Sequence, residues 1–166
     1  MKQDRLKLNK GQILVELMVA ISVMVIGLLG IFTLLSQSLG LNRVAAEQYI
    51  AAHLAAEGIE VVKNIVDHNI IEGNPWNDGV ETDGEFGIEY SSLVLDPNLA
   101  EEKLKFDEDT GRYNYSTGRD TNFKRIIAID NISQDEVRVN SRVEWQSRGG
   151  TSFSVDLEDH FYNWRP

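Results

Sequence analysis

KGQILVELMVAISVMVIGLLGIFTLL, residues 10–35, is the most informative stretch of this 166-residue chain. Within it, Ile13–Leu35 contains 23 residues, of which only Glu16 carries a formal charge. A helix rises about 1.5 Å per residue, so this run would be about 34 Å long and could cross a hydrocarbon core of about 30 Å. A buried core helix is the alternative, but it needs fewer apolar residues. The run therefore predicts a transmembrane helix.

Charge is distributed unevenly around this run. The formal net charge is −10, but residues 1–11 carry +3 and the remainder carries −13. The positive-inside rule then keeps residues 1–10 in the cytoplasm and places the acidic remainder outside. A cleaved secretory signal would have a shorter apolar run followed by an A-x-A-like site, whereas this run ends in Ser36-Gln37-Ser38. The acidic remainder predicts no direct nucleic-acid binding.

Glu16 is the polar exception in the apolar run. A carboxylate there costs about 2–3 kcal/mol even on mild insertion scales, so a partner is expected. Within the intact chain the nearest cation is Lys10. A cut after Gly11 would create another, because the new α-amine of Gln12 would lie four residues, about 6 Å of helix, from Glu16. Glu16 is therefore a candidate functional residue of the run.

The segment Lys10–Glu16, following a short basic leader and opening a long apolar run, resembles the type IV pilin and pseudopilin superfamily. By this resemblance a prepilin peptidase cuts after Gly11 on the cytoplasmic face and N-methylates Gln12. Glu16 is then the position-five glutamate that assembles the filament. The family most often has phenylalanine at the first mature position, where this chain has Gln12, and many members have a proline late in the run, which is absent here.

The resemblance implies a structural role. The chain would be a minor pilin of a type IV pilus-like filament, with prepilin peptidase, other pilin subunits, the inner-membrane assembly platform and the membrane as partners. It would be a single-pass protein of the cytoplasmic (inner) membrane with its N-terminus inside, and then part of a cell-surface pilus or a periplasmic pseudopilus. The alternatives are a type II secretion pseudopilin and an uncleaved, membrane-anchored binding protein.

Three regions follow: a leader (1–11), a transmembrane and assembly helix (12–36) and an extracytoplasmic domain (37–166). The helical pattern continues to about Asp67, with an apolar stripe at Ala51, Leu54, Gly58, Val61 and Ile65. The fold class is therefore α+β: a long N-terminal helix, membrane-spanning in its first half and amphipathic in its second, packed on a C-terminal antiparallel sheet.

Alternating apolar residues predict the strands of that sheet. We expect a loop over 70–87 anchored by Trp76, and a strand over 86–95. A hairpin should form around Glu108–Gly111, followed by a strand over 123–129. Two long strands, 137–145 and 153–157, should pair through a turn at Ser147–Gly150. Consecutive hairpins of this kind predict an antiparallel meander with one face on the helix.

Other sites are weaker. Asp107 and Asp109 precede Gly111 and resemble part of a calcium loop, but residue 118, the twelfth from Asp107, is glycine rather than glutamate. The three histidines share no metal-ligand spacing, and cysteine is absent. We therefore predict no cofactor and no enzymatic activity. Tyr162 and Trp164 could form a binding patch, but we expect them to close the core.

Overall fold

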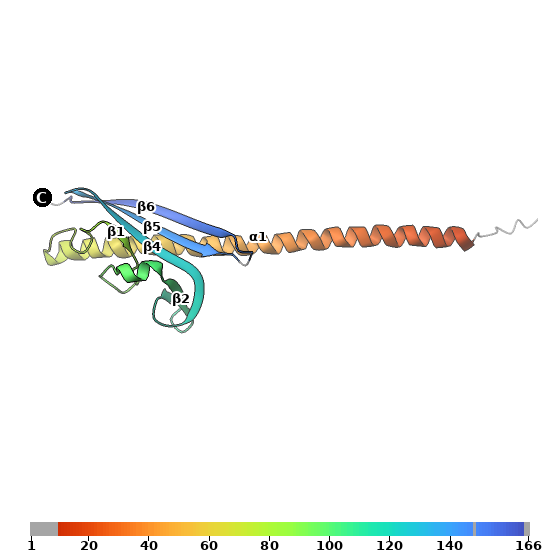
Figure 1. Ribbon diagram of the computed structural model, residues 1–166, viewed down its shortest axis with the longest axis horizontal. Coiled ribbons are helices and arrows are strands. Elements are labelled where there is room, and N and C mark those ends of the chain that lie inside the picture. Colours follow the sequence, from red (N-terminus) through yellow and green to blue (C-terminus); the bar gives the residue numbers. More distant parts are fainter. Residues whose placement is uncertain (1–9, 148, 165–166) are drawn as a thin grey trace, which may run out of the picture. The chain divides into compact units, whose positions relative to one another are not determined.

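The structure is a computed structural model that describes residues 10–147 and 149–164, with only the backbone described for Lys10. One long helix, α1 (Lys10–Glu72), precedes a six-stranded antiparallel sheet, which confirms the α+β class (Figure 1). The chain divides into two compact units between Ala45 and Ala46, and each unit is described by itself. We call residues 46–164 the body.

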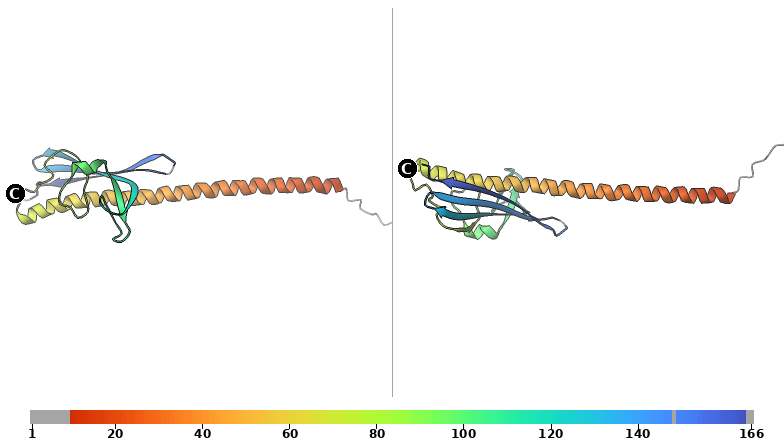
Figure 2. Two further views of the ribbon diagram at one scale, coloured as in Figure 1. Left: turned by 60° about the horizontal axis from the view of Figure 1, so that its bottom comes forward. Right: turned by 90° about the horizontal axis from the view of Figure 1, so that it is seen from above.

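The remaining elements all belong to the body. They are β1 (Gly84–Phe86), a 3₁₀ helix η1 (Pro97–Glu101), β2 (Lys103–Asp107), β3 (Arg112–Asn114), β4 (Arg119–Ser133), β5 (Glu136–Gln146) and β6 (Ser152–Tyr162). The strands lie in the order β3-β2-β4-β5-β6, and β1 pairs with β4 beside this path. Figures 1 and 2 show the long strands running along the part of α1 that belongs to the body.

The predicted apolar stripe is the face of α1 that packs on the sheet. Its side chains at Ala51, Leu54, Val61 and Ile65 are 5% exposed or less. The helix ends at Glu72 because Gly73 adopts a φ of +77°, which favours glycine, and the N–H of Asn74 closes the last turn on the carbonyl of Asn69. Amphipathic periodicity thus identifies the buried face, but the helix continues to Glu72, beyond the predicted end at about Asp67, and the predicted loop over 70–87 contains its last residues and β1 (Gly84–Phe86).

The inner face of β5 lies at the centre of the body. Val137, Val139, Ser141, Val143 and Trp145 are all buried, in the alternation that the sequence predicts. Around Trp145, aromatic rings contact one another from β3 to β6: Tyr113 with Phe123, Phe123 with Trp145, and Trp145 with Phe153. This face supplies the apolar area that the helix covers, and it is the main source of the stability of the body.

Gly58 allows the helix to approach the sheet closely. A Cβ atom added there would clash with the Oγ atom of Ser141 and with a methyl group of Ile127. The glycine is therefore required by packing, although its backbone conformation is ordinary.

Two sequence expectations for the body are wrong. Residues 88–95 are not a strand, because the strand stops at Phe86 and only the isolated bridge between Gly87 and Asp96 follows. Ile88 and Leu95 lie in a loop, and their side chains are buried in the core. The sheet is also not a simple meander, since β4 pairs with β2 and leaves β3 at the edge.

Aromatic side chains that were expected to close the core do not do so. Tyr162 and Trp164 are 53% and 66% exposed. In the loop after the helix, Val80 is the fully buried anchor, whereas Trp76 packs only partly against the core.

Candidate functional site: the polar residues of the apolar helix

Gly11, Gln12 and Glu16 all lie in the first turns of α1, and all are exposed. Gln12 and Glu16 are four residues apart and therefore share one helix face. Among the described residues, no atom lies within 4 Å of a side chain added at Gly11. The predicted processing and assembly positions thus lie within the first two turns of α1 and are accessible there. The leader, residues 1–9, lies outside the described residues, as does the side chain of Lys10.

The hydroxyl groups of Ser22 and Thr33 make hydrogen bonds within their own helix. The Ser22 hydroxyl donates to the carbonyl of Met18 at 2.7 Å, and the Thr33 hydroxyl donates to that of Leu29 at 2.9 Å. Such bonds within one helix hide a hydroxyl from lipid. Among the side chains described from Gly11 onward, Glu16 makes no such bond. Its carboxylate is therefore available for a partner, either Lys10, whose side chain lies outside the described residues, or a group from another chain.

The apolar side chains around Glu16 are open as well. Those of Ile13, Leu14, Val15 and Leu17 are each about half exposed, and the exposure continues along the run to Leu41. By length and composition, α1 is long and apolar enough to cross a membrane, and its most apolar stretch is not buried in the protein. A helix of this kind fits a membrane anchor. It is also unbroken at Gly27 and Gly30, so neither glycine unwinds it.

The calcium candidates have a structural explanation. Asp107 and Asp109 lie at the turn between β2 and β3, where an Asp107 carboxylate oxygen accepts hydrogen bonds from the backbone N–H groups of Asp109 and Thr110. These bonds lower the pKa of Asp107 and fix the turn. In the described part of the chain, no three His, Cys, Asp or Glu side chains cluster as a metal site would require.

His160 belongs to a polar cluster on the outer face of β5 and β6. Its Nδ1 lies 2.7 Å from a carboxylate oxygen of Glu136, and Tyr162 donates its hydroxyl hydrogen to the same oxygen. The hydrogen bond with Glu136 raises the pKa of His160 above 6.5, and the bonds from His160 and Tyr162 lower the pKa of Glu136 below 4.5. The cluster joins the ends of β5 and β6.

This pair predicts a pH dependence of stability. The raised pKa of His160 gives a contribution that is complete below about pH 6.5 and is lost as the pH rises through the raised value. The lowered pKa of Glu136 gives one that is complete above about pH 4.5 and is lost as the pH falls through the lowered value. We expect His160→Gln to reduce the urea midpoint more at about pH 5.5 than at about pH 8.5. An equal reduction at both pH values would contradict the ion pair.

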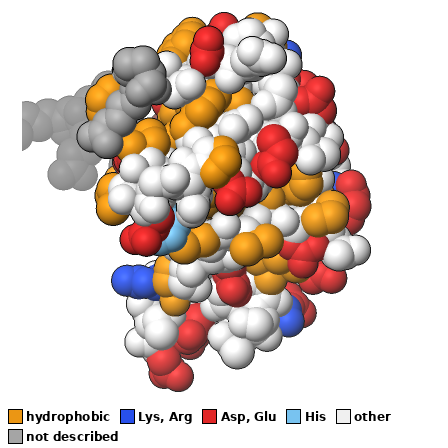
Figure 3. All heavy atoms as spheres, turned by 90° about the vertical axis from the view of Figure 1, so that its left-hand side faces the viewer, with side chains coloured by type: hydrophobic (Ala, Val, Ile, Leu, Met, Phe, Trp, Pro, Cys, Tyr) orange, Lys and Arg blue, Asp and Glu red, His pale blue; other side chains and the backbone are white. Residues whose placement is uncertain are grey.

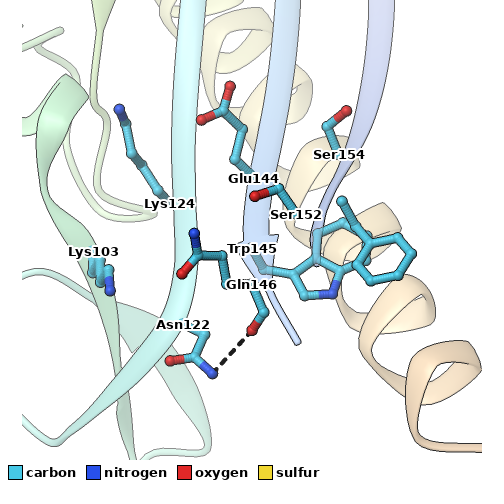
Figure 4. Close-up of a pocket in the computed structure, with 9 residues that line it drawn as sticks. Lys103, Asn122, Lys124, Glu144, Trp145, Gln146, Ser152 and Ser154 are labelled. Atoms are coloured by element: carbon cyan, nitrogen blue, oxygen red, sulfur yellow. Dashed lines mark hydrogen bonds between the residues drawn. The ribbon is translucent and has the colours of Figure 1, made fainter. Parts of the chain in front are cut away.

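A shallow pocket of about 490 Å³ lies at one end of the sheet (Figure 4). Its polar lining comes from four strands, with Lys103, Asn122, Gln146 and Ser152 among the residues drawn. Asn122 is engaged with the Gln146 carbonyl at 3.3 Å, and Lys124 with Glu101 at 2.7 Å. The lining places the hydroxyl groups of Ser152 and Ser154 in one pocket with the charged side chains of Lys103, Lys124 and Glu144.

Arg125 is an important residue that the sequence analysis missed. Its side chain is completely buried between β4 and α1. It donates to the carbonyls of Leu54 and Ile88 and to a carboxylate oxygen of Glu57 at 3.0 Å. The signal was present in the sequence, because strand alternation puts Arg125 in phase with the inward-facing residues Phe123 and Ile127. A charge in that phase needs an internal partner.

Searches against protein-family models, curated proteins and solved structures find no match for this chain. Its function must therefore be argued from the helix and the body themselves. Figure 3 shows one end of the body, where acidic side chains are more frequent than basic ones and apolar side chains lie between them. That surface agrees with the acidic composition outside the first residues.

Proposed function

We propose that this chain is a minor, pilin-like structural subunit that a prepilin peptidase cuts after Gly11 and that assembles through its N-terminal helix. The observation that carries the proposal is that Glu16 has no hydrogen-bond or ion-pair partner among the side chains described from residue 11 onward, in a run where the hydroxyl groups of Ser22 and Thr33 bond to their own helix. In a filament, the carboxylate would pair with the Gln12 ammonium of a neighbouring subunit. The pair would reduce the cost of the buried charge and set the axial register.

The open apolar surface of residues 13–41 supports the same proposal. Before assembly, lipid would cover this surface in the inner membrane, with the N-terminus in the cytoplasm. After assembly, the helices of neighbouring subunits would cover it in a surface pilus or a periplasmic pseudopilus. Pairing of Glu16 with a neighbour also separates this proposal from a plain anchor, because an anchor needs neither the cut nor the glutamate.

Glu16→Gln and Glu16→Leu test the proposal in cells that contain a prepilin peptidase and a filament assembly system. Both variants should be inserted and cut after Gly11, but they should enter filaments poorly because the charge that pairs with Gln12 is gone. Glu16→Leu should even be more compatible with lipid, by about 2–3 kcal/mol. The measurements are the intact mass of the subunit and its amount in sheared filaments relative to the membrane fraction.

Ser22→Ala is the matched control, because it removes a polar group that bonds only to its own helix. It should assemble like the wild type. Normal incorporation of Glu16→Leu would refute the charge pair. Assembled chains that still begin at Met1 would refute the processing step, and uncut chains with full activity in the membrane would favour the anchored binding protein.

A further inference from the structure

Strand β6 leaves one edge of the sheet open. Each of its residues, from Ser152 to Tyr162, pairs with a residue of β5, without any register shift. Within the described ranges, 10–147 and 149–164, no strand pairs with the other side of β6. Figures 1 and 2 show β6 as the outermost of the long strands. A row of backbone N–H and C=O groups is therefore available along this side.

The geometry of β6 does not protect this edge. Natural edge strands are usually short or bulged, or contain proline. β6 has 11 residues, about twice the usual strand length, with neither glycine nor proline among them. The opposite edge is different, because β3 has only three residues and the chain bends at Gly111 before it and Gly118 after it. The sheet thus has one short edge at β3 and one long edge at β6.

Apolar surface is also open along β6. Phe153, Val155, Leu157 and Phe161 share the inner face with the buried residues of β5 that pair with them. Their partners are between 0% and 4% exposed, whereas Leu157 is 37% exposed and the other three are only partly buried. An additional strand beside β6 would extend the sheet and cover this row with its own apolar side chains.

Charge determines which strand the edge accepts. Asp156, Glu158 and Asp159 are exposed on β6, and Asp159 interrupts the apolar inner row between Leu157 and Phe161. If two copies of β6 paired antiparallel, with Leu157 of one copy opposite Leu157 of the other, Asp156 of each copy would lie opposite Glu158 of the other. Parallel pairing in register would place each carboxylate beside its own copy. Like charges in these positions are destabilising, so both of these pairings with a second copy of this chain are disfavoured, whereas a basic strand would be attracted.

We propose that the β6 edge binds an extended segment of a partner protein in which Lys or Arg alternates with apolar residues. Backbone hydrogen bonds along the edge provide affinity, as in other examples of strand addition. The basic row faces Asp156 and Glu158 on the outer face, and the apolar row covers Phe153, Val155 and Leu157 on the inner face. This inference concerns the body alone and holds whether or not the helix assembles into a filament.

The test uses the full chain in neutral detergent micelles and a fluorescent peptide of alternating Lys and Val, with binding followed by anisotropy. The alternating peptide should bind, and peptides with Glu in place of Lys, or with Lys and Val in two separate blocks, should bind at least about 10-fold more weakly. Failure of the alternating peptide to bind, or equal binding of the block peptide, would overturn the proposal.

Hydrogen bonding between the backbones of the peptide and β6 can be tested separately, with modified peptides. Two versions of the alternating peptide carry N-methyl groups on every second amide, one in each frame. Only one frame removes the N–H groups that face β6, so one version should lose at least about 10-fold in affinity and the other should keep it. Full binding of both versions would overturn strand addition. This arm needs no change to the protein and cannot be confused with misfolding.

A matched pair of variants locates the site. Asp156→Lys with Glu158→Lys should weaken binding at least about 10-fold. Glu108→Lys with Asp109→Lys causes the same change in net charge at the exposed turn between β2 and β3, and it should leave the affinity within about 2-fold of wild type. Equal losses in the two double variants would mean that overall charge attracts the peptide, and would overturn the assignment to β6.

Discussion

Replacement of Val143 by aspartate is expected to abolish the cooperative fold of the body. The Val143 side chain is 0% exposed, and it lies in the cluster that contains Leu54, Phe123 and Trp145. A carboxylate there would lose its water without gaining a partner, which costs several kcal/mol whether it remains charged or takes up a proton. We expect a loss of at least about 4 kcal/mol, a large share of the roughly 5–15 kcal/mol that stabilises a domain.

Urea unfolding of the full chain in detergent measures this loss. Tryptophan fluorescence is the suitable signal, because Trp145 lies in the affected cluster and the helical signal of residues 10–45 does not contribute to it. The control is Gln146→Asp, which adds the same carboxylate to an exposed position of the same strand and should change stability by about 0.5 kcal/mol or less. Similar losses in both variants would contradict the assigned inner face of β5.

The parts of the fold that the sequence predicts well are those with unambiguous periodicity. The stripe from Ala51 to Ile65 has helical spacing, and the alternation from Val137 to Trp145 has strand spacing, so each identifies its own buried face. The turn at Glu108–Gly111 is equally clear, because an aspartate that can accept backbone hydrogen bonds precedes a glycine with a positive φ. These three patterns together determine the α+β class.

The segment from Ile88 to Leu95 shows where alternation misleads. Its apolar residues occur at intervals that suit a strand, yet Val94 is 70% exposed and only Ile88 and Leu95 reach the core. Two buried side chains are enough to order a loop. The periodicity of a single sequence cannot distinguish such a loop from a strand. Pairing order has the same difficulty, because the position of β3 at the edge depends on contacts between segments distant in sequence.

Part of the candidate site is visible in the sequence and part is not. The spacing of Gly11, Gln12 and Glu16 can be interpreted without the tertiary structure, because the three positions lie within two turns of one helix and Gln12 and Glu16 share a face. The internal bonds of Ser22 and Thr33, which make Glu16 distinctive, require the structure. The same holds for the open edge of β6, because the sequence predicts that a last strand exists but not which side of it remains unpaired.

Arg125→Ala has the second large expected effect. It tests the contacts by which Arg125 of β4 holds α1 against the sheet. The change would leave the carbonyls of Leu54 and Ile88 and the carboxylate of Glu57 without their donor, and it would open a cavity beside Gly58. The Glu57 side chain is 36% exposed and can be hydrated, so the cost comes mainly from the buried carbonyls and the cavity, about 2–4 kcal/mol together. We expect a loss in this range by urea unfolding of the full chain in detergent.

Two comparisons show whether the loss comes from the buried charge network. Arg138→Ala removes an arginine from the next strand, where its pair with Asp130 at 2.9 Å is partly exposed, so it should cost only about 0–1 kcal/mol. A double-mutant cycle of Arg125→Ala with Glu57→Gln should give a coupling energy of about 1 kcal/mol or more, because the two side chains bond directly. Additive losses would mean that Arg125 acts through the backbone carbonyls alone. A loss no larger than that of Arg138→Ala would show that Arg125 does not join α1 to the sheet.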